Sequence, residues 1–174
     1  SADAHCFHQH REGEYKMTYG VVDRKSHKFY TYMSAVFEAI GQRQKQYNWL
    51  ITDCECYPEN EEFEQLFSGK YCWLSGEELS EIIAKEDFQW IWGVLCGFEK
   101  EIPLEDVLTY PLPVSMDYNG YYCNPVSLQH PLATVEIVPF DSTWTVLVSK
   151  DKAIVDRYRE RYPKAEDLSE FNAR

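Results

Sequence analysis

The segment Gln89-Trp90-Ile91-Trp92-Gly93-Val94-Leu95-Cys96-Gly97-Phe98 is the starting point for the architecture of this chain. Its ten residues carry no charge and are rich in aromatic and β-branched side chains. A run of this length and composition predicts a strand that is buried on both faces. We therefore expect residues 89–98 to form the central strand of a single sheet. Gly93 and Gly97 would allow a bulge or another backbone to approach that strand closely.

Other segments show the patterns of further strands and helices. The predicted strands are residues 17–22, 47–56, 71–74 and 88–98 with a hairpin over 134–149, and the predicted helices lie near 30–41, 76–85 and 151–162. The best-defined helix start is at Ser75, because Glu78 follows three residues later and the two can form a capping box. Strands and helices mixed in this order predict an α+β fold, a mostly antiparallel sheet of about five or six strands with two or three helices packed on it.

The length of 174 residues suits one domain with a proper core and is short for two. We expect residues 1–16 to be a disordered tail and residues 17–174 to be a single domain that starts near Met17. The N-terminus lacks the basic and apolar regions of a signal peptide, and no apolar run approaches the ~20 residues of a membrane helix. Either the chain is cytoplasmic or a signal peptide has already been removed. We favour the first and predict a cytoplasmic protein that does not bind membranes.

The cysteines and histidines predict neither disulfides nor a metal centre. The six cysteines are Cys6, Cys54, Cys56, Cys72, Cys96 and Cys123. A chain of this length does not need covalent cross-links, so we expect these cysteines to be reduced. Cys54-Glu55-Cys56 has no second pair at zinc spacing, and the cluster of His5, His8 and His10 around Cys6 lacks the further ligands of a rigid site. We predict no metal and no cofactor.

Negative charge is concentrated in the middle third of the sequence. The net charge is −12, and residues 53–106, with 15 acidic and three basic residues, carry the whole excess. Such a field repels nucleic acid and attracts basic proteins. The predicted partner-binding acids are Asp53, Glu55, Glu59, Glu61, Glu62 and Glu64. Strand alternation would place Asp53 and Glu55 on one face and Cys54 and Cys56 on the other. The alternative is that this charge only keeps the protein in solution.

Residues 110–131 form a long irregular connection that is rich in tyrosine. Tyr118, Tyr121 and Tyr122 are candidate partner-binding anchors, since tyrosine is large and rigid with a polar tip. Equally, these side chains could pack the connection onto the sheet. A runner-up function is a small hydrolase or transferase with a pocket near this loop that uses His130 and a carboxylate. No P-loop, nucleophile elbow or H-E-x-x-H motif is present, so we predict no catalytic residue.

Three segments carry a resemblance to small bacterial proteins of unassigned role: residues 71–79, 89–93 and 127–133. In overall build the chain also resembles the immunity proteins of bacterial toxin–immunity systems, which are compact, acidic domains that cap a toxin, often a basic nuclease. The resemblance implies a non-catalytic binding protein that neutralises a basic protein partner such as a toxin, and it assigns no functional residue. A third option is a structural subunit that dimerises through the acid-free edge of the sheet.

Overall fold

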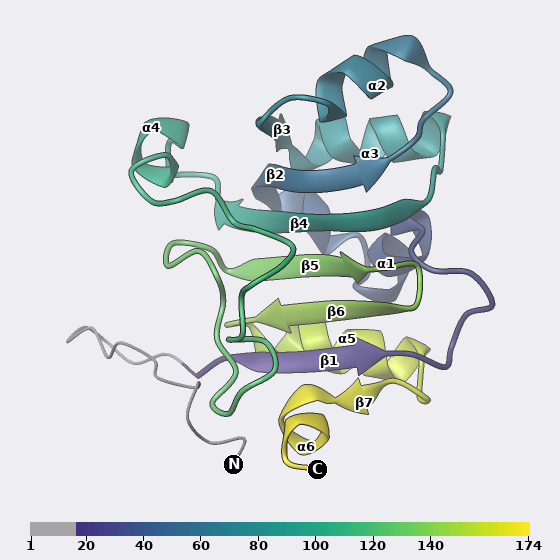
Figure 1. Ribbon diagram of the computed structural model, residues 1–174, viewed down its shortest axis with the longest axis vertical. Helices are drawn as coiled ribbons and strands as arrows, with labels where there is room; N and C mark the ends of the chain where they lie inside the picture. Colours follow the sequence, from purple (N-terminus) through teal and green to yellow (C-terminus); the bar gives the residue numbers. More distant parts are fainter. Residues whose placement is uncertain (1–16) are drawn as a thin grey trace.

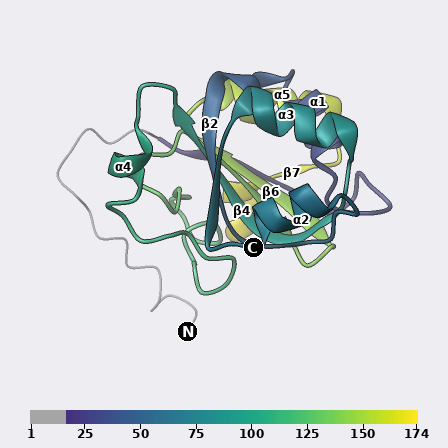
Figure 2. The same cartoon turned by 90° about the horizontal axis from the view of Figure 1, so that it is seen from above.

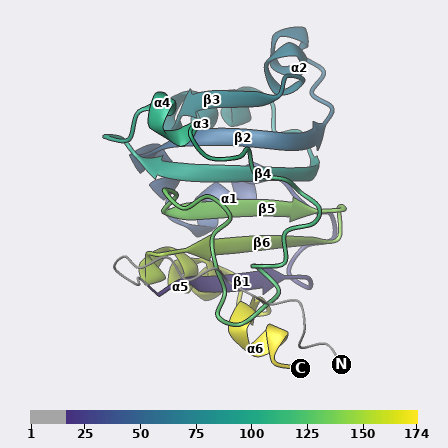
Figure 3. The same cartoon turned by 60° about the vertical axis from the view of Figure 1, so that its left-hand side comes forward.

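In the computed structural model, which describes residues 17–174, one antiparallel sheet contains all the strands of the described chain. The strands are β1 (Tyr19–Asp23), β2 (Tyr47–Cys56), β3 (Tyr71–Ser75), β4 (Trp90–Glu99), β5 (Val135–Phe140), β6 (Trp144–Ser149) and β7 (Glu166–Asp167). The helices are α1 (Met33–Ala39), the 3-10 helix η1 (Arg43–Gln46), α2 (Glu61–Phe67), α3 (Gly76–Lys85), α4 (Leu104–Val107), α5 (Lys152–Arg161) and α6 (Leu168–Asn172). The strand order is β3-β2-β4-β5-β6-β1-β7, which Figure 3 shows from top to bottom as far as β1.

The predicted α+β class and antiparallel sheet are confirmed, but the numbers of elements were too low. Residues 17–174 contain seven strands and six α-helices, where five or six strands and two or three helices were expected. The elements beyond those numbers are short: β7 has two residues, and α2, α4 and α6 have between four and seven. Elements of this length span too few residues to produce a recognisable hydrophobic period.

Strand β4 is buried on both faces, as its composition predicts. Trp90 and Leu95 belong to the core on one side of the sheet, and Val94 and Phe98 belong to the core on the other side. The strand is paired with β2 and β5, so it is internal, but it stands third of seven and β5 occupies the centre. The expected central position was therefore wrong by one place, because β7 extends the far edge of the sheet.

The two faces of the sheet are covered in different ways. Helices α1, α3 and α5 lie together on one face, as Figure 2 shows from above. The long connection between β4 and β5, which includes α4, crosses the other face in front of the strands in Figure 1. Helix α6 adds Leu168 and Phe171 to the core on that side. The irregular connection therefore forms a second layer over this face, and Tyr118, Tyr121 and Tyr122 pack against its core.

Local sequence signals determine where the helices begin. The Glu78 N–H donates to Ser75 Oγ at 3.0 Å and the Ser75 N–H donates to Glu78 Oε1 at 3.1 Å, which confirms the predicted capping box of α3. Helix α1 begins at Met33, three residues later than predicted. The reason is tertiary: Thr31 exchanges backbone hydrogen bonds with Trp90, which holds that part of the chain extended.

Candidate functional site

The six predicted partner-binding acids lie close together along the chain at one corner of the sheet, and all six are exposed. This acidic corner consists of Asp53, Glu55, Glu59, Glu61, Glu62 and Glu64. It comprises the last residues of β2, the connection that follows, and the first turn of α2. Figure 1 shows α2 at the top of the molecule. The structure therefore leaves all six predicted residues exposed at the end of β2 and the start of α2.

A β-bulge at Asp53 shapes the sheet part of this corner. Asp53 has a positive φ of 49°, and the register between β2 and β4 shifts on both sides of Glu55. The Ser115 N–H donates to Asp53 Oδ2 at 2.7 Å, and Ser115 Oγ donates to the Asp53 carbonyl at 2.9 Å. Cys54 and Cys56 pack toward the core on the helical face. The predicted separation of the two acids from the two cysteines is thus consistent with the observed contacts.

Helix α2 is held by polar contacts at its N-terminus. Asn60 Oδ1 accepts hydrogen bonds from the Glu62 and Phe63 N–H groups at 3.0 and 3.2 Å. The carboxylate of Glu86 accepts from the Glu59 and Asn60 N–H groups at 2.7 and 3.0 Å. These contacts fix the direction of the helix while leaving the side chains of its acidic first turn in solvent. Negative charge at this position also stabilises the helix dipole.

The acidic corner is not neutralised by neighbouring cations. Within residues 17–174, no Lys, Arg or His nitrogen lies within 4 Å of any of its six carboxylates. The contrast is Glu77, also in the acidic third of the sequence, which pairs with Lys100 at 2.7 Å. The local contacts of the corner are hydrogen bonds from Ser115 to Asp53 and from the Tyr57 hydroxyl to Glu55 at 2.8 Å. The corner therefore presents nearly its full negative charge to solvent.

Two shallow hollows flank the bulge. One has a volume of about 370 Å³ and is lined by residues 52–54, 67–70 and 112–114. The other has a volume of about 310 Å³ and is lined by Asp53, Cys54, Glu55, Trp92, Ser115 and Met116. Both hollows are open to solvent, and Cys54 lines both of them. The second combines carboxylates with the apolar surface of Trp92 and Met116, which suits a long basic side chain.

The loop tyrosines mostly pack inward. Tyr121 is only 3% exposed. The Tyr118 hydroxyl lies 2.7 Å from Ser127 Oγ and donates to the Leu128 carbonyl at 2.8 Å, and burial raises its pKa to about 12. Tyr122 is half-buried, and its hydroxyl has no hydrogen-bond partner within residues 17–174. The structure thus favours the packing interpretation, and Tyr121 in particular is not available as a surface anchor.

A buried carboxylate that the sequence analysis missed anchors this loop. Glu136 is fully buried, and its Oε1 accepts from the Tyr121 hydroxyl at 2.8 Å and from the Gln129 N–H at 2.6 Å. Its Oε2 accepts from the His130 N–H at 2.9 Å and from the Cys96 thiol at 3.2 Å. Burial raises the pKa of Glu136, and the four donors oppose that effect. The signal available in the sequence was a single acid within an otherwise apolar strand.

His130 has the environment of a structural residue. It is 1% exposed, its Nε2 lies 2.9 Å from the Val107 carbonyl, and its Nδ1 accepts from the Leu132 N–H at 3.1 Å. This pattern requires the neutral tautomer with the proton on Nε2. Burial lowers the pKa of His130. Both ring nitrogens are engaged, so the ring cannot take a substrate proton without breaking one of these bonds.

A second polar cluster that sequence reasoning missed lies at the end of β1. The fully buried carboxylate of Asp23 accepts from the Tyr158 hydroxyl at 2.8 Å and from the Ser26 N–H at 3.1 Å. His27 Nε2 lies 3.6 Å from the same carboxylate, and the His27 N–H donates to the Tyr30 hydroxyl at 2.9 Å. These contacts tie the turn after β1 to helix α5. Polar turn composition alone did not indicate that Asp23 would be buried.

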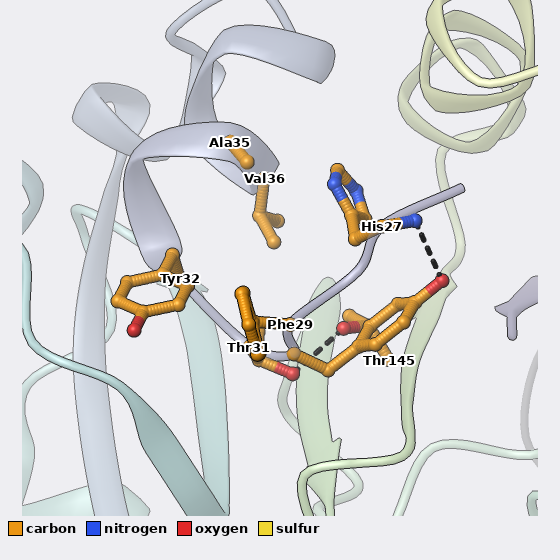
Figure 4. A pocket seen from close by; sticks show the side chains of 8 residues that line it. His27, Phe29, Thr31, Tyr32, Ala35, Val36 and Thr145 are labelled. Carbon is orange, nitrogen blue, oxygen red and sulfur yellow. Dashed lines mark hydrogen bonds between the residues drawn. The ribbon is translucent and has the colours of Figure 1, made fainter. Parts of the chain in front are cut away.

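A small cavity adjoins this cluster, and Figure 4 shows the side chains around it. Its volume is about 50 Å³, and Thr31 Oγ1 and Thr145 Oγ1 lie 2.8 Å apart in its wall. A space of this size holds a few water molecules and no organic substrate. Phe29, also in the wall, is 63% exposed. We assign this region to loop anchoring.

The cysteine prediction requires a correction. Cys54, Cys56, Cys72 and Cys96 are free, as expected, but Cys123 is disulfide-bonded. The predicted tail with its histidine cluster lies outside the described residues. Length and compartment arguments indicate whether a chain needs disulfides, but they cannot tell which sulfur atoms the fold brings together. Within residues 17–174, no group of three or more His, Cys, Asp or Glu side chains has the arrangement of a metal site.

Comparison with known proteins places the chain in a family. Residues 20–112, more than half of the chain, match the family described as "Protein of unknown function (DUF2691)", and the chain belongs to this family. The matched range runs from β1 through the acidic corner and ends in the irregular connection. No curated protein and no solved structure matches the chain. Among the helices of residues 17–174, none combines the length and apolar character needed to span a membrane.

Proposed function

We propose that this protein is a non-catalytic binding protein that neutralises a basic protein partner, such as a bacterial toxin, through its acidic corner. The observation that carries the proposal is the set of six exposed carboxylates without a basic neighbour in the described chain. An uncompensated field of this kind raises the association rate of a basic partner by 10- to 1,000-fold, on the order seen for steered complexes.

Helix stability alone does not account for the whole corner. Glu61, Glu62 and Glu64 occupy the first turn of α2, where negative charge is favourable for the helix itself. Asp53 and Glu55 lie on a strand and gain nothing from the dipole of α2. Both carboxylates are exposed and have no basic neighbour within residues 17–174, so they are open to pairing with a cationic partner.

Contact surface beside the charges completes the proposed interface. Tyr57 is 69% exposed and Met116 is 58% exposed, and each lies next to a residue of the acidic corner. Exposed aromatic and methionine side chains provide apolar contact area, while surrounding charges set orientation and rate. Ser115 holds the Asp53 carboxylate and Glu86 holds the backbone at Glu59, which lowers the conformational entropy lost on binding at these two points.

The proposed location is the cytoplasm. Four free cysteines support a reducing compartment, and the disulfide at Cys123 is the one observation that does not. The structure gives no support to the hydrolase or transferase alternative at His130, because this residue is buried and both of its ring nitrogens are already hydrogen-bonded.

The proposal is tested with two charge-reversal variants of equal net charge. In the first, four of the six acids of the corner are reversed: Glu59→Lys, Glu61→Lys, Glu62→Lys and Glu64→Lys. In the control, exposed acids elsewhere are reversed: Glu101→Lys, Glu105→Lys, Glu160→Lys and Glu170→Lys. Wild type and both variants are immobilised, exposed to extract of the native host at low salt, and eluted at high salt. Bound proteins are identified, and their association rates are measured with purified components.

The expected result is a basic protein that binds wild type and control but associates at least ~10-fold more slowly with the corner variant at low salt. High salt should reduce this difference. Equal association rates for the two variants would show that total charge matters and the corner does not. Binding that is insensitive to both variants would remove the basis of the proposal.

A further inference from the structure

Two free cysteines alternate with the strand acids at the end of β2. Cys54 and Cys56 are separated by one residue, are both half-buried, and both pack toward the helical face of the sheet. Cys54 also lines both hollows beside the bulge, so solvent-accessible space adjoins this residue. The pair therefore combines proximity along the chain with an access route for a small reagent.

The backbone around this pair can bend at low cost. Residues two apart in a strand have Cα atoms about 6.6 Å apart, which is near the upper limit of 4.4–6.8 Å for a disulfide, so a slight contraction is needed. The pairing of β2 with β3 ends at Thr52, so the strand has one partner beyond that residue. On the β4 side, the register shifts around Glu55 interrupt the ladder. Few backbone hydrogen bonds therefore oppose a contraction between the two sulfur atoms.

The surroundings distinguish Cys54 from the other free thiols. The Cys54 thiol lies 3.1 Å from the Phe67 carbonyl, and its pKa is lowered, chiefly by a hydrogen bond from Cys56. By contrast, the pKa of Cys56 is raised by the same hydrogen bond and by burial. Burial also raises the pKa of Cys72, to about 12, and that of Cys96. Cys54 is thus the thiol best suited to start an exchange reaction, with Cys56 as its resolving neighbour.

We infer that Cys54 and Cys56 form a redox-active dithiol that exchanges with small-molecule disulfides such as oxidised glutathione. The Cys54 thiolate attacks one sulfur of glutathione disulfide, forming a mixed disulfide and releasing one glutathione thiolate. Cys56 then loses its proton to water and attacks Cys54 Sγ, which releases the second glutathione. The net reaction oxidises two protein thiols to one disulfide and reduces glutathione disulfide to two thiols. This inference does not depend on the basic partner proposed above.

The test is site-resolved mass spectrometry of the wild-type protein after equilibration with oxidised glutathione. Remaining thiols are alkylated in denaturant and the peptides are mapped. The expected product is an internal disulfide between Cys54 and Cys56, seen as loss of two hydrogens from their shared peptide, while Cys72 and Cys96 remain alkylated. Added dithiothreitol should restore both thiols. In Cys56→Ser, the mixed disulfide of Cys54 with glutathione should accumulate, and Cys72→Ser serves as the matched control that still closes the bridge.

Two results would overturn the inference. One is full alkylation of Cys54 and Cys56 after treatment, which would mean that neither thiol exchanges. The other is a bridge from Cys54 to Cys72, or glutathione on both residues of the pair, which would mean that the geometry of the bulge does not permit closure. The wild-type measurement decides between these results even if a serine variant fails to fold.

Discussion

Replacing Tyr121 with Phe should destabilise the protein through Glu136. The substitution keeps the ring, which packs 4.7 Å from the Tyr118 ring, and removes the hydroxyl that donates to Glu136 Oε1 at 2.8 Å. Both partners are buried, so water cannot replace the lost donor. A hydrogen bond to a charged group contributes about 1.5–3 kcal/mol. For a chain of this size, a mid-range loss of ~2 kcal/mol corresponds to a decrease in Tm of about 4–8 °C.

The effect should depend on pH in a defined direction. Burial raises the pKa of Glu136 above its value in the unfolded chain. The stability that this shift contributes is therefore fully present below the unfolded-state pKa and is lost as pH rises through the folded-state pKa. The Tyr121 hydroxyl stabilises the ionised carboxylate most strongly. The difference in unfolding free energy between wild type and Tyr121→Phe should therefore increase as pH rises through this range.

The assay is urea unfolding at acidic and neutral pH, with Tyr122→Phe as the matched control. The Tyr122 hydroxyl is buried and has no hydrogen-bond partner within residues 17–174, so its removal should not lower the unfolding free energy. Equal losses for the two variants would show that ring packing, and not the carboxylate, determines the effect. A loss for Tyr121→Phe that does not vary with pH would refute the role assigned to Glu136.

Three further predictions concern stability. Gly76→Ala should lower the unfolding free energy measured in urea by about 3 kcal/mol, because the new Cβ would lie 2.0 Å from the Gln44 carbonyl oxygen. Gly69→Ala is the control and should be nearly neutral, because the closest contact of its new Cβ is at 3.8 Å. Similar losses for the two variants would contradict the packing argument. Ser75→Ala should lose about 1 kcal/mol with the capping box, and an unchanged Tm would argue against that cap. Burial lowers the pKa of His130, so its contribution is present above the unfolded pKa of ~6.5 and is lost as pH falls through the folded pKa. His130→Gln should lower stability at neutral pH and flatten this acid slope, and an unchanged slope in thermal melts would count against the neutral tautomer.

The parts of the fold that were predictable are those determined by local pattern. Strand β2 has the bounds that its sequence indicated, and helix α3 starts at the predicted capping box. The start of α1 was not predictable, because a pairing with Trp90 from a distant part of the chain overrides the apolar stripe that includes Tyr30. Local periodicity contains no information about such long-range pairing. The same limit applies to β7, whose two residues are defined by their partners on β1.

The candidate site likewise has one part that the sequence predicts and another part that it does not. The acidic corner could be found from the sequence, because charge density is a property of the sequence itself and exposed acids need no specific partner. The burial of Tyr121 and the four-donor site of Glu136 could not be found, because they depend on how the irregular connection folds over the sheet. The sequence left both interpretations of the tyrosines open, and only the packing of that connection distinguishes them.

Two kinds of carboxylate in this chain show why the acidic corner calls for a function. Glu136 is buried, and a buried charge is tolerated only with hydrogen-bond donors, so its four donors explain its place through stability alone. Asp53 and Glu55 are exposed, and their carboxylates accept hydrogen bonds from the Ser115 N–H and the Tyr57 hydroxyl. Neither carboxylate has a cationic partner within residues 17–174. A basic partner would supply that missing cation, which is why we propose binding at this corner and assign structural support to Glu136.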